Sequence, residues 1–389
     1  MIMDSHYKAE LETAITLARH AAVISRAALA NASRKPLSAN GDEGQADNDS
    51  KIENIIKEDF SPVTIADFAI QALLAGSFCQ TTPGFSLIGE ESADELRQNP
   101  VLLDRVYRLL VDSSPPIWCP KDKEELCRAI DECTSLTGPI DSGSETAAVW
   151  VFDPIDGTKT YMRGEQYAIN IALLNAGKQM LSVVALPLLD HNASNSTSCS
   201  PVSDADLDPS GKGTLLFAVR GHGTHVLPLF VDPSEQAPVP KRLPRHADAD
   251  GSSSQQQLRA VTSTNLDSGI ESIHSLVAST LEISAPPCDL LGWVPRWSAL
   301  AMGLGNVTVW VYKSRKRTGK LWDHAGAMLL FEEVGGKITD IHGRPIDLSP
   351  GRLLKNNFGF VAAPPAHHAK VLKAVQTALR EKDREDLLE

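Results

Sequence analysis

Two carboxylates three residues apart follow an apolar run in the middle of the chain. The run Ala147–Phe152 is short, apolar and rich in bulky residues, which predicts a buried strand. Asp153 and Asp156 come directly after it, and Gly157-Thr158 is typical of a tight turn or the start of a helix. Carboxylates beside free backbone N–H groups can hold a hard divalent cation and a phosphate together. The pattern therefore predicts metal-assisted phosphate hydrolysis.

The turn between these two acids adds a third possible ligand. Pro154 stiffens the turn, and the i, i+3 spacing can bring Asp153 and Asp156 to one side of it. The carbonyl oxygen of Ile155 is then free to bind Mg²⁺, which accepts such a ligand readily. The alternative is an Asx-type turn that caps the following segment, because Asp, Pro and Gly are common turn residues.

Further acids stand at three other places in the chain. Asp67 lies among apolar neighbours, where a carboxylate is costly to bury unless it is paired or bound to a metal. Glu90 and Glu91 follow a short predicted strand, although two adjacent acids are normally solvated. Asp323 opens a predicted helix, where capping is the simpler explanation. His324 beside it is expected to pack or to support the site, because oxygen donors are already sufficient for the metal.

Taken together, these pieces resemble a known enzyme family. Gly89–Ser92, Asp153–Thr158 and Trp322–Gly326 have the order and separation of the motifs of the lithium-sensitive, magnesium-dependent phosphomonoesterases of the inositol monophosphatase superfamily. Within it, Ser61–Asp67, the Arg-Gly-Glu-Gln element at 163–166 and the stretch 218–223 are similar to the branch of 3′(2′),5′-bisphosphate nucleotidases. This resemblance covers most of the chain outside its polar inserts.

The resemblance implies a mechanism and a role for each motif residue. It implies that two or three Mg²⁺ ions are held by Glu90, Asp153, the carbonyl of Ile155, Asp156 and Asp323. Asp67 and the Thr158 hydroxyl would orient and deprotonate the attacking water, and the N–H groups of Gly157 and Thr158 would hold phosphate oxygens. The implied reaction converts adenosine 3′,5′-bisphosphate to AMP and phosphate, with the sulfated analogue as a second candidate substrate. Lithium inhibition is expected through replacement of one weakly held Mg²⁺.

The nucleoside side departs from the pattern of that branch. The branch carries a Lys where this chain has Arg296, while Trp293 and Trp310 stand where a Ser and an Arg are usual. Its usual histidine is replaced around Ser263 and Thr264, and these two residues with Arg296 are the predicted substrate contacts. Either tryptophan could stack on adenine or be buried in the core. An inositol phosphate phosphatase is the alternative with the same chemistry, and a non-catalytic metal-binding regulator is the alternative of another class.

Periodicity and turn residues predict the elements that position these groups. Helices are expected over 7–31, 64–79 and within 100–146, and paired strands over 167–174 with 179–187 and 214–221 with 225–230. The last third predicts strands at 258–263 and 307–312, a hairpin around His342-Gly343, and helices at 267–280, 295–304, 321–334 and 366–381. This order favours a layered α/β, or α+β, sandwich of two lobes. The lobes are 1–188 and 214–389, with polar surface inserts at 31–50, 189–213 and 232–257 that are expected to be disordered.

Composition limits the class of protein and its compartment. The chain has 389 residues, 42% of them hydrophobic, and a net charge of −12, which argues against a nucleic-acid scaffold. No apolar stretch is long enough for a membrane span. The resemblance implies that the partner is a small phosphorylated molecule. The six cysteines lack disulfide or zinc spacing, and the start of the chain lacks a secretory pattern; the prediction is cytoplasmic, with an organellar signal in 1–26 left open. The basic run Lys313–Arg317 is typical of a solvated loop, with phosphate binding or targeting as the alternative.

Overall fold

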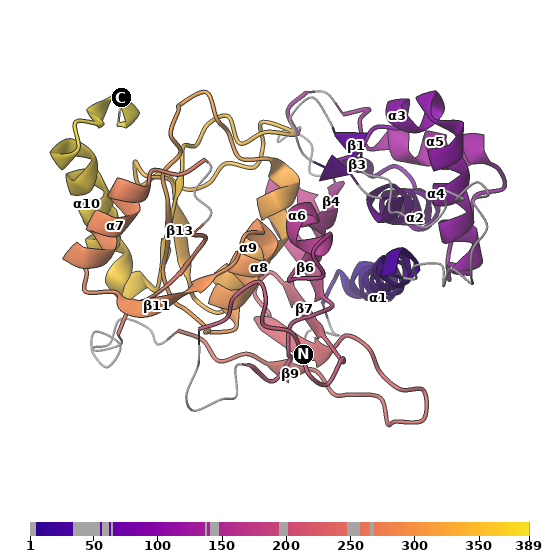
Figure 1. Cartoon of the computed structure of the whole chain (residues 1–389), viewed down its shortest axis with the longest axis horizontal. Helices are drawn as coiled ribbons and strands as arrows, with labels where there is room; N and C mark the ends of the chain where they lie inside the picture. Colours follow the sequence, from indigo (N-terminus) through magenta and orange to yellow (C-terminus); the bar gives the residue numbers. More distant parts are fainter. Residues whose placement is uncertain are drawn as a thin grey trace, which may run out of the picture.

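A seven-stranded sheet forms the centre of the molecule, in the strand order β3-β4-β5-β6-β7-β8-β9 (Figure 1). β3 and β4 are parallel, and every other neighbouring pair is antiparallel. The bounds are β3 Ser86–Gly89, β4 Ala148–Asp156, β5 Ala168–Asn175, β6 Lys178–Leu186, β7 Thr214–Val219, β8 Thr224–Pro228 and β9 Lys241–Arg242. The computed structural model describes residues 5–33, 55–56, 62–63, 65–136, 138–140, 148–193, 201–246, 257–264 and 268–388.

Helices from the N-terminal part of the chain cover one face of this sheet. α1 (Lys8–Ser33) packs on β5 and β6, and α2 (Ile65–Thr81) packs on β4 and on α1. The Phe78 ring stacks on Trp150 of β4 at a centroid distance of 4.0 Å. Behind them lie α3 (Asp94–Gln98), α4 (Pro100–Asp112) and α5 (Lys123–Glu132), while β1 (Ile55–Ile56) pairs with β2 (Pro62–Val63).

Two further helices separate the large sheet from a second one. α8 (Trp293–Ala301) and α9 (Leu321–Glu333) pack on β4, β5 and β6. β12 (Thr308–Trp310), β14 (Phe360–Ala363) and β13 (Lys337–Thr339) form an antiparallel sheet in that order. A parallel bridge from Ala260 to Val307 joins it to the parallel pair β10 (Arg259–Thr262) and β11 (Ser284–Asp289). α7 (Glu271–Thr280) and α10 (Pro365–Glu381) complete the outer layer (Figure 1).

Five layers of alternating helices and sheets result, which confirms the predicted layered α/β sandwich. The central strands β4 to β7 are almost fully buried because a helix layer covers each face of the sheet, whereas the edge strand β9 is exposed. The other predicted helices and strand pairs are present with shifted ends, but the hairpin predicted around His342-Gly343 is wrong: a turn lies there, and β13 pairs with the distant strand β14. The strands β14, β11 and the short edge strand β9 were not expected. The two-lobe division stays a prediction; its boundary at 188 falls between β6 and β7, which are neighbours in one sheet.

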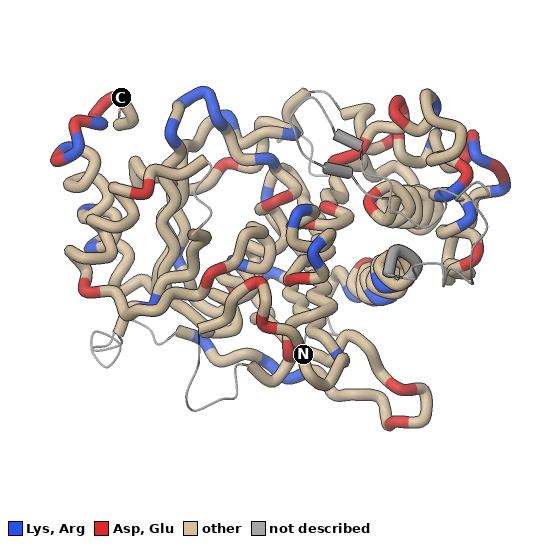
Figure 2. Tube along the Cα trace, in the orientation of Figure 1, with Lys and Arg blue, Asp and Glu red and all other residues tan. Residues whose placement is uncertain are grey.

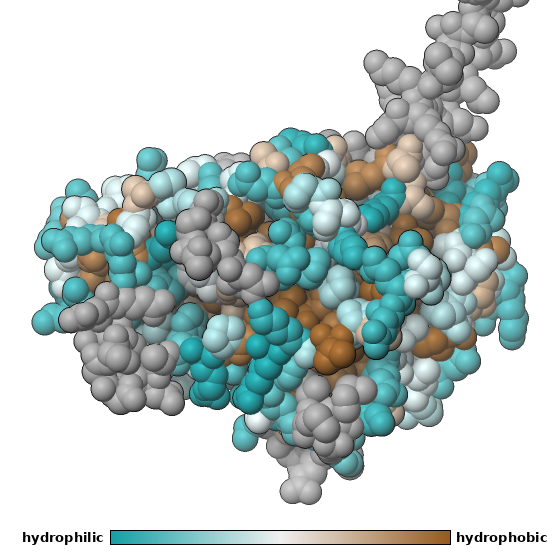
Figure 3. Space-filling model, turned by 90° about the horizontal axis from the view of Figure 1, so that it is seen from below, coloured by the Kyte–Doolittle hydropathy of each residue, from teal (hydrophilic) through white to brown (hydrophobic). Residues whose placement is uncertain are grey.

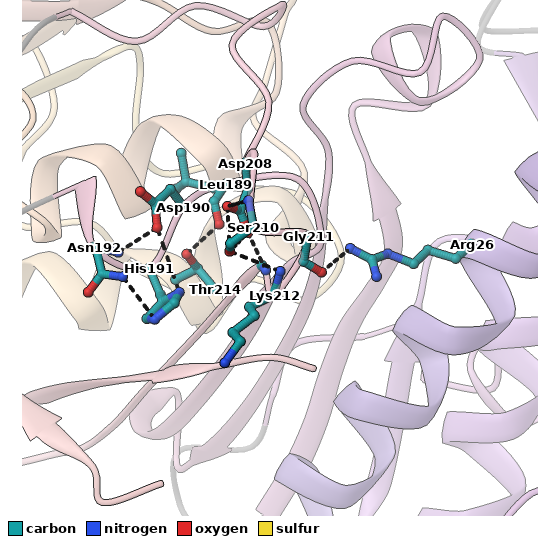
Figure 4. Close-up of polar contacts among 11 residues, drawn as sticks. Arg26, Leu189, Asp190, His191, Asn192, Asp208, Ser210, Gly211, Lys212 and Thr214 are labelled. Carbon is teal, nitrogen blue, oxygen red and sulfur yellow. Dashed lines mark hydrogen bonds and ion pairs between the residues drawn. The ribbon is translucent and has the colours of Figure 1, made fainter. Parts of the chain in front are cut away.

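The part of the 189–213 insert that the structure describes is anchored, contrary to the prediction of disorder (Figure 4). The Asp208 carboxylate accepts the N–H groups of Ser210 (2.8 Å) and Gly213 (2.7 Å). Arg26 of α1 donates to the carbonyl of Gly211 at 2.9 Å. These bonds tie the return of the insert to the sheet and to the first helix. Residues 34–50, 194–200 and 247–256 lie outside the described residues.

The surface shows no concentration of large apolar side chains among the described residues. Seen from below, hydrophobic residues are interspersed with hydrophilic ones (Figure 3). The large exposed hydrophobic residues belong to separate segments and are Val23, Val101, Leu207 and Val239. No helix in the described part of the chain is long and apolar enough to cross a membrane.

Candidate metal and phosphate site

The parallel pairing of β3 and β4 brings two of the predicted acidic motifs together. Gly89, the last residue of β3, is in register with Phe152 of β4. Glu90 and Asp153 follow these partners, so both leave the sheet at the same edge. Gly89 is needed for this approach, because a Cβ there would lie 2.8 Å from the Gln71 amide and 2.9 Å from the Phe152 ring.

An irregularity at the end of β4 changes the direction of the backbone between the two carboxylates of the central motif, which are both buried. The register between β4 and β5 shifts between Asp153 and Asp156, which re-aims side chains as a β-bulge does. The carboxylate of Asp153 accepts the Ile155 N–H at 3.1 Å, and the Ile155 carbonyl accepts the Thr158 hydroxyl at 3.2 Å. The chain then passes through Gly157, whose φ of 89° lies in the left-handed region. α6 (Thr158–Tyr161) starts there, and backbone N–H groups in a first helical turn have no acceptor inside the helix.

The third acidic motif is carried by α9, near the C-terminal end of the sequence. Asp323 lies in the first turn of this helix, which packs against β4 and β5. The Asn170 amide donates to the Trp322 carbonyl at 2.6 Å, and Gly326 lets the helix approach, because a Cβ there would overlap the Asn170 side chain. One carboxylate oxygen each of Asp153, Asp156 and Asp323 then lies within 4.8 Å of the other two.

Burial and mutual repulsion make this cluster unfavourable without a cation. Burial, followed by the charges of Glu90, Asp156, Asp323 and Asp67, raises the pKa of Asp153 well above its ordinary value. Burial, Asp156 and Glu90 do the same to the pKa of Asp323, against the opposing charges of Lys320 and Arg317. Buried carboxylates that repel one another are stabilised by a bound divalent cation with oxygen ligands. The residues therefore fit the predicted metal.

Asp156 carries contacts that the sequence did not indicate. The Val294 N–H, in the first turn of α8, donates to its carboxylate at 2.6 Å. Burial raises the pKa of Asp156 to about 7, while the Val294 hydrogen bond and the Arg296 charge oppose the shift. Gly292 lies against the same carboxylate and leaves no room for a side chain, because a Cβ there would be 2.6 Å from the Asp156 oxygen. A backbone donor leaves no signature in the sequence, so this support was missed.

Glu90 is held between two segments on the rim of the site. Lys320 Nζ lies 3.5 Å from its carboxylate, and Arg352 donates to its carbonyl at 3.3 Å. The next residue, Glu91, has its N–H bonded to the Gln71 side chain of α2 at 2.7 Å, which fixes the backbone. No pattern in the sequence connected Lys320 with Glu90, because the two residues are 230 positions apart by their numbers.

Asp67 is also placed close to the cluster, in the first turn of α2 with 2% of its surface exposed. Its charge contributes to the raised pKa of Asp153 and of Tyr161. The predicted pairing of Asp67 with the Thr158 hydroxyl stays a prediction, because the hydrogen bond of that hydroxyl is to the Ile155 carbonyl.

The predicted substrate residues have different surroundings from those expected. Arg296 is 2% exposed, and it donates to the carbonyls of Leu290 (2.7 Å) and Leu291 (2.8 Å). Its guanidinium carbon lies 4.4 Å from the ring centre of Trp293 and 4.5 Å from that of Trp310, and these two rings contact each other edge to face. Both tryptophans, for which adenine stacking is one of the two expectations, therefore contact an arginine here. This packing provides no exposed guanidinium for a substrate.

Ser263 and Thr264 lie at the end of β10. Ser263 is 2% exposed, and Thr264 donates through its N–H and its hydroxyl to the Asp289 carboxylate at 2.8 and 2.5 Å. Their contact with a substrate stays a prediction. His324, as expected, packs inside: its Nδ1 pairs with Trp297 Nε1 at 3.1 Å, and burial, with a smaller effect of Arg296, lowers its pKa to about 3.

Known proteins are similar to this chain over nearly its whole length. The sequence model described as the inositol monophosphatase family matches residues 10–380. The chain is 32% identical to a 3′(2′),5′-bisphosphate nucleotidase of Schizosaccharomyces pombe, over 85% of this chain and 87% of the relative. It is 31% identical to the enzyme of that name from Oryza sativa, over 84% and 87%. The solved structure of Thermotoga maritima IMPase shares the fold, with 17% identity, a TM-score of 0.55 and coverage of 96% and 99%.

Proposed function

Because the chain belongs to the inositol monophosphatase family, we propose that it is a metal-dependent phosphomonoesterase that converts adenosine 3′,5′-bisphosphate to AMP and phosphate. The observation that carries the chemistry is the cluster of Asp153, Asp156 and Asp323, whose carboxylate oxygens lie within 4.8 Å of one another. The choice of substrate rests on the names of the relatives, together with the Arg-Gly-Glu-Gln element at 163–166.

Two or three Mg²⁺ ions would be held by oxygen ligands from the residues already described, namely Glu90, Asp153, the carbonyl of Ile155, Asp156 and Asp323. Bound there, they would lower the pKa of a water molecule and offset the charge of the phosphate. Lithium would inhibit by taking the place of a weakly held ion. This metal identity and this ion count are part of the proposal.

The protein groups then have separate tasks. The Asp67 carboxylate accepts a proton from the attacking water, and the Thr158 hydroxyl orients that water toward phosphorus. The N–H groups of Gly157 and Thr158 donate to phosphate oxygens, as the first turn of a helix is suited to do. The water oxygen forms a bond to phosphorus in line with the bond to the 3′ oxygen, which breaks, and the released 3′ oxygen takes a proton from solvent to become the 3′ hydroxyl of AMP.

Phosphate release from adenosine 3′,5′-bisphosphate with Mg²⁺ tests the proposal. The expected result is release that depends on Mg²⁺, falls in millimolar Li⁺ and exceeds release from inositol 1,4-bisphosphate. Faster release from the inositol phosphate would keep the mechanism and change the substrate. Release from neither substrate, by a protein that binds Mg²⁺, would favour the non-catalytic regulator.

The cellular role follows from the same proposal. Hydrolysis of adenosine 3′,5′-bisphosphate would clear a by-product of sulfate assimilation, with the cytoplasm as the expected compartment. Localisation of a fluorescently tagged full-length chain would test the compartment independently of activity.

A further inference from the structure

A small basic pocket lies in the C-terminal part of the chain, apart from the acidic cluster. It is formed by the loop after β12, by the turn after β13 and by the segment before β14. Its volume is about 80 Å³. Its lining is polar apart from one ring, and it consists of Arg315, Thr318, His342, Arg344, Lys355, Asn356, Asn357 and Phe358.

The turn that presents His342 and Arg344 is rigidly built. The Asp340 carboxylate accepts the N–H groups of His342 (3.0 Å) and Arg344 (2.9 Å). It also accepts the amide of Asn357 at 3.2 Å, so the turn is tied to the opposite wall of the pocket. Because these bonds use the backbone of Arg344, its guanidinium is not needed to hold the turn.

The cationic groups of the pocket retain hydrogen-bond donors for a ligand. Arg315 donates one N–H to the Leu387 carbonyl at 2.9 Å, and its guanidinium lies 5.5 Å from the Phe358 ring centre. A guanidinium has five N–H donors, so others remain. Arg344 and Lys355 are exposed, and neither forms an ion pair with a carboxylate in the part of the chain that the structure describes.

The charge of the pocket is opposite to that of the molecule. The whole chain has 49 acidic and 37 basic residues, yet the pocket lining contains two arginines, a lysine and a histidine and no carboxylate. The acids around the pocket are already engaged: Asp340 by the turn, Asp347 by Asn356 (2.6 Å) and Ser349, and Asp386 by Arg384 at 2.9 Å. Figure 2 shows Lys and Arg gathered on the loop after β12, in the upper part of the molecule. Such a local excess of positive charge is suited to an anion.

We propose that this pocket binds the oxyanion of a phosphate or sulfate group, through Arg315, Arg344 and Lys355. Guanidinium groups match the geometry of a tetrahedral oxyanion, and the ammonium of a lysine adds a mobile point charge. The pocket is also connected to the metal site: the loop that carries Arg315 and Thr318 continues to Lys320, which is paired with Glu90. Of the Lys313–Arg317 run, Arg315 lines this pocket, so the run contributes a binding group and is more than a solvated loop.

Binding of labelled inorganic sulfate to the full-length, Mg²⁺-loaded protein tests this site, by equilibrium dialysis at an ionic strength kept constant with chloride. The double variant Arg344→Gln/Lys355→Gln should bind sulfate roughly tenfold more weakly, because two charged donors are lost. The control Lys121→Gln/Lys370→Gln removes the same charge from exposed positions outside the pocket, and it should bind as the unaltered protein does.

No sulfate binding by the unaltered protein, or equal weakening in both double variants, would overturn the proposal. This titration needs no turnover, so its outcome is independent of the proposed phosphatase activity.

Kinetics then separate the two sources of the oxyanion. If the pocket holds a second phosphate of the substrate, the pocket variant raises KM for adenosine 3′,5′-bisphosphate and leaves KM for 3′-AMP unchanged. If it holds a free anion, neither KM changes in the absence of sulfate.

Discussion

At the residue scale, the acidic cluster consists of carboxylates that repel one another and are largely shielded from solvent. Asp153 and Asp156 are buried at the end of β4, and Asp323 faces them from α9. The same arrangement that makes these carboxylates unfavourable alone would favour the binding of a divalent cation, as we propose. Function and instability thus have one physical cause here.

Removal of one of these carboxylates should abolish turnover and leave the fold intact. For Asp153→Asn or Asp323→Asn, we expect kcat to fall roughly a thousandfold or more, because a metal ligand worth several kcal/mol is lost. Steady-state phosphate release measures the change, with a circular dichroism spectrum as the test of folding. Asp94→Asn, at an exposed carboxylate outside the cluster, is the matched control. Activity within tenfold of the control would show that the metal assignment is wrong.

Arg296 is better explained as a positioning residue than as a substrate contact. It holds the carbonyls of Leu290 and Leu291, just before the turn whose Val294 N–H bonds to Asp156. Arg296→Lys keeps a positive charge but cannot make both hydrogen bonds in the same geometry. We expect the Mg²⁺ concentration for half-maximal activity to rise several-fold, with KM for the nucleotide nearly unchanged. A rise in KM with an unaltered Mg²⁺ dependence would restore the substrate role.

At the element scale, the connection from β4 to α6 depends on a glycine with a left-handed backbone. Gly157 has a φ of 89°, and a Cβ there would lie 2.7 Å from the Thr160 hydroxyl. Gly164 also has a positive φ of 71°, but nothing lies within 4 Å of its Cβ position. An alanine at either position would therefore suffer the same backbone strain, but only an alanine at position 157 would also clash with Thr160.

This difference predicts the outcome of the two alanine substitutions. Gly164→Ala should cost about 1 kcal/mol of unfolding free energy, from the left-handed backbone alone. Gly157→Ala should cost about 1 kcal/mol more and should also lower kcat, because α6 carries Thr158. Urea unfolding and phosphate release measure the two effects. Equal losses of unfolding free energy in both variants would mean that the contact between a Cβ at position 157 and Thr160 does not destabilise the start of α6.

At the scale of the whole molecule, the cluster makes the stability of the metal-free protein depend on pH. The folded state raises the pKa of Asp156 from 3.8 to about 7, and it also raises the pKa of Asp153 and Asp323. A raised carboxyl pKa means that the folded state binds protons more tightly than the unfolded state. The stabilisation is therefore complete below the ordinary pKa of an aspartate and is lost as the pH rises toward 7.

We expect the metal-free protein to lose on the order of 4 kcal/mol between pH 4 and pH 7 from Asp156, since each pKa unit corresponds to about 1.4 kcal/mol. Saturating Mg²⁺ should remove most of this loss, because the ions bind the ionised carboxylates. Urea unfolding at several pH values, with EDTA or with Mg²⁺, measures the difference. If Mg²⁺ stabilised the protein equally at pH 5 and pH 8, the carboxylates would not be its ligands.

Local chemistry in the sequence was enough to determine the residue types of the site and most of its elements. An apolar run followed by Asp153, Asp156 and Gly157 specifies a strand end and a turn, because strand burial and glycine torsions act over a few residues. Helical periodicity likewise located α1, α2 and α9.

Only the tertiary structure decided which distant groups meet. The approach of Asp323 to β4 depends on the packing of Gly326 against Asn170, and the pairing of Lys320 with Glu90 depends on where the loop after β12 places Lys320. The contact of Arg296 with two tryptophan rings and the hydrogen bond from a backbone N–H to Asp156 have the same origin. Such contacts arise from packing between elements, and no local pattern of residue types encodes them.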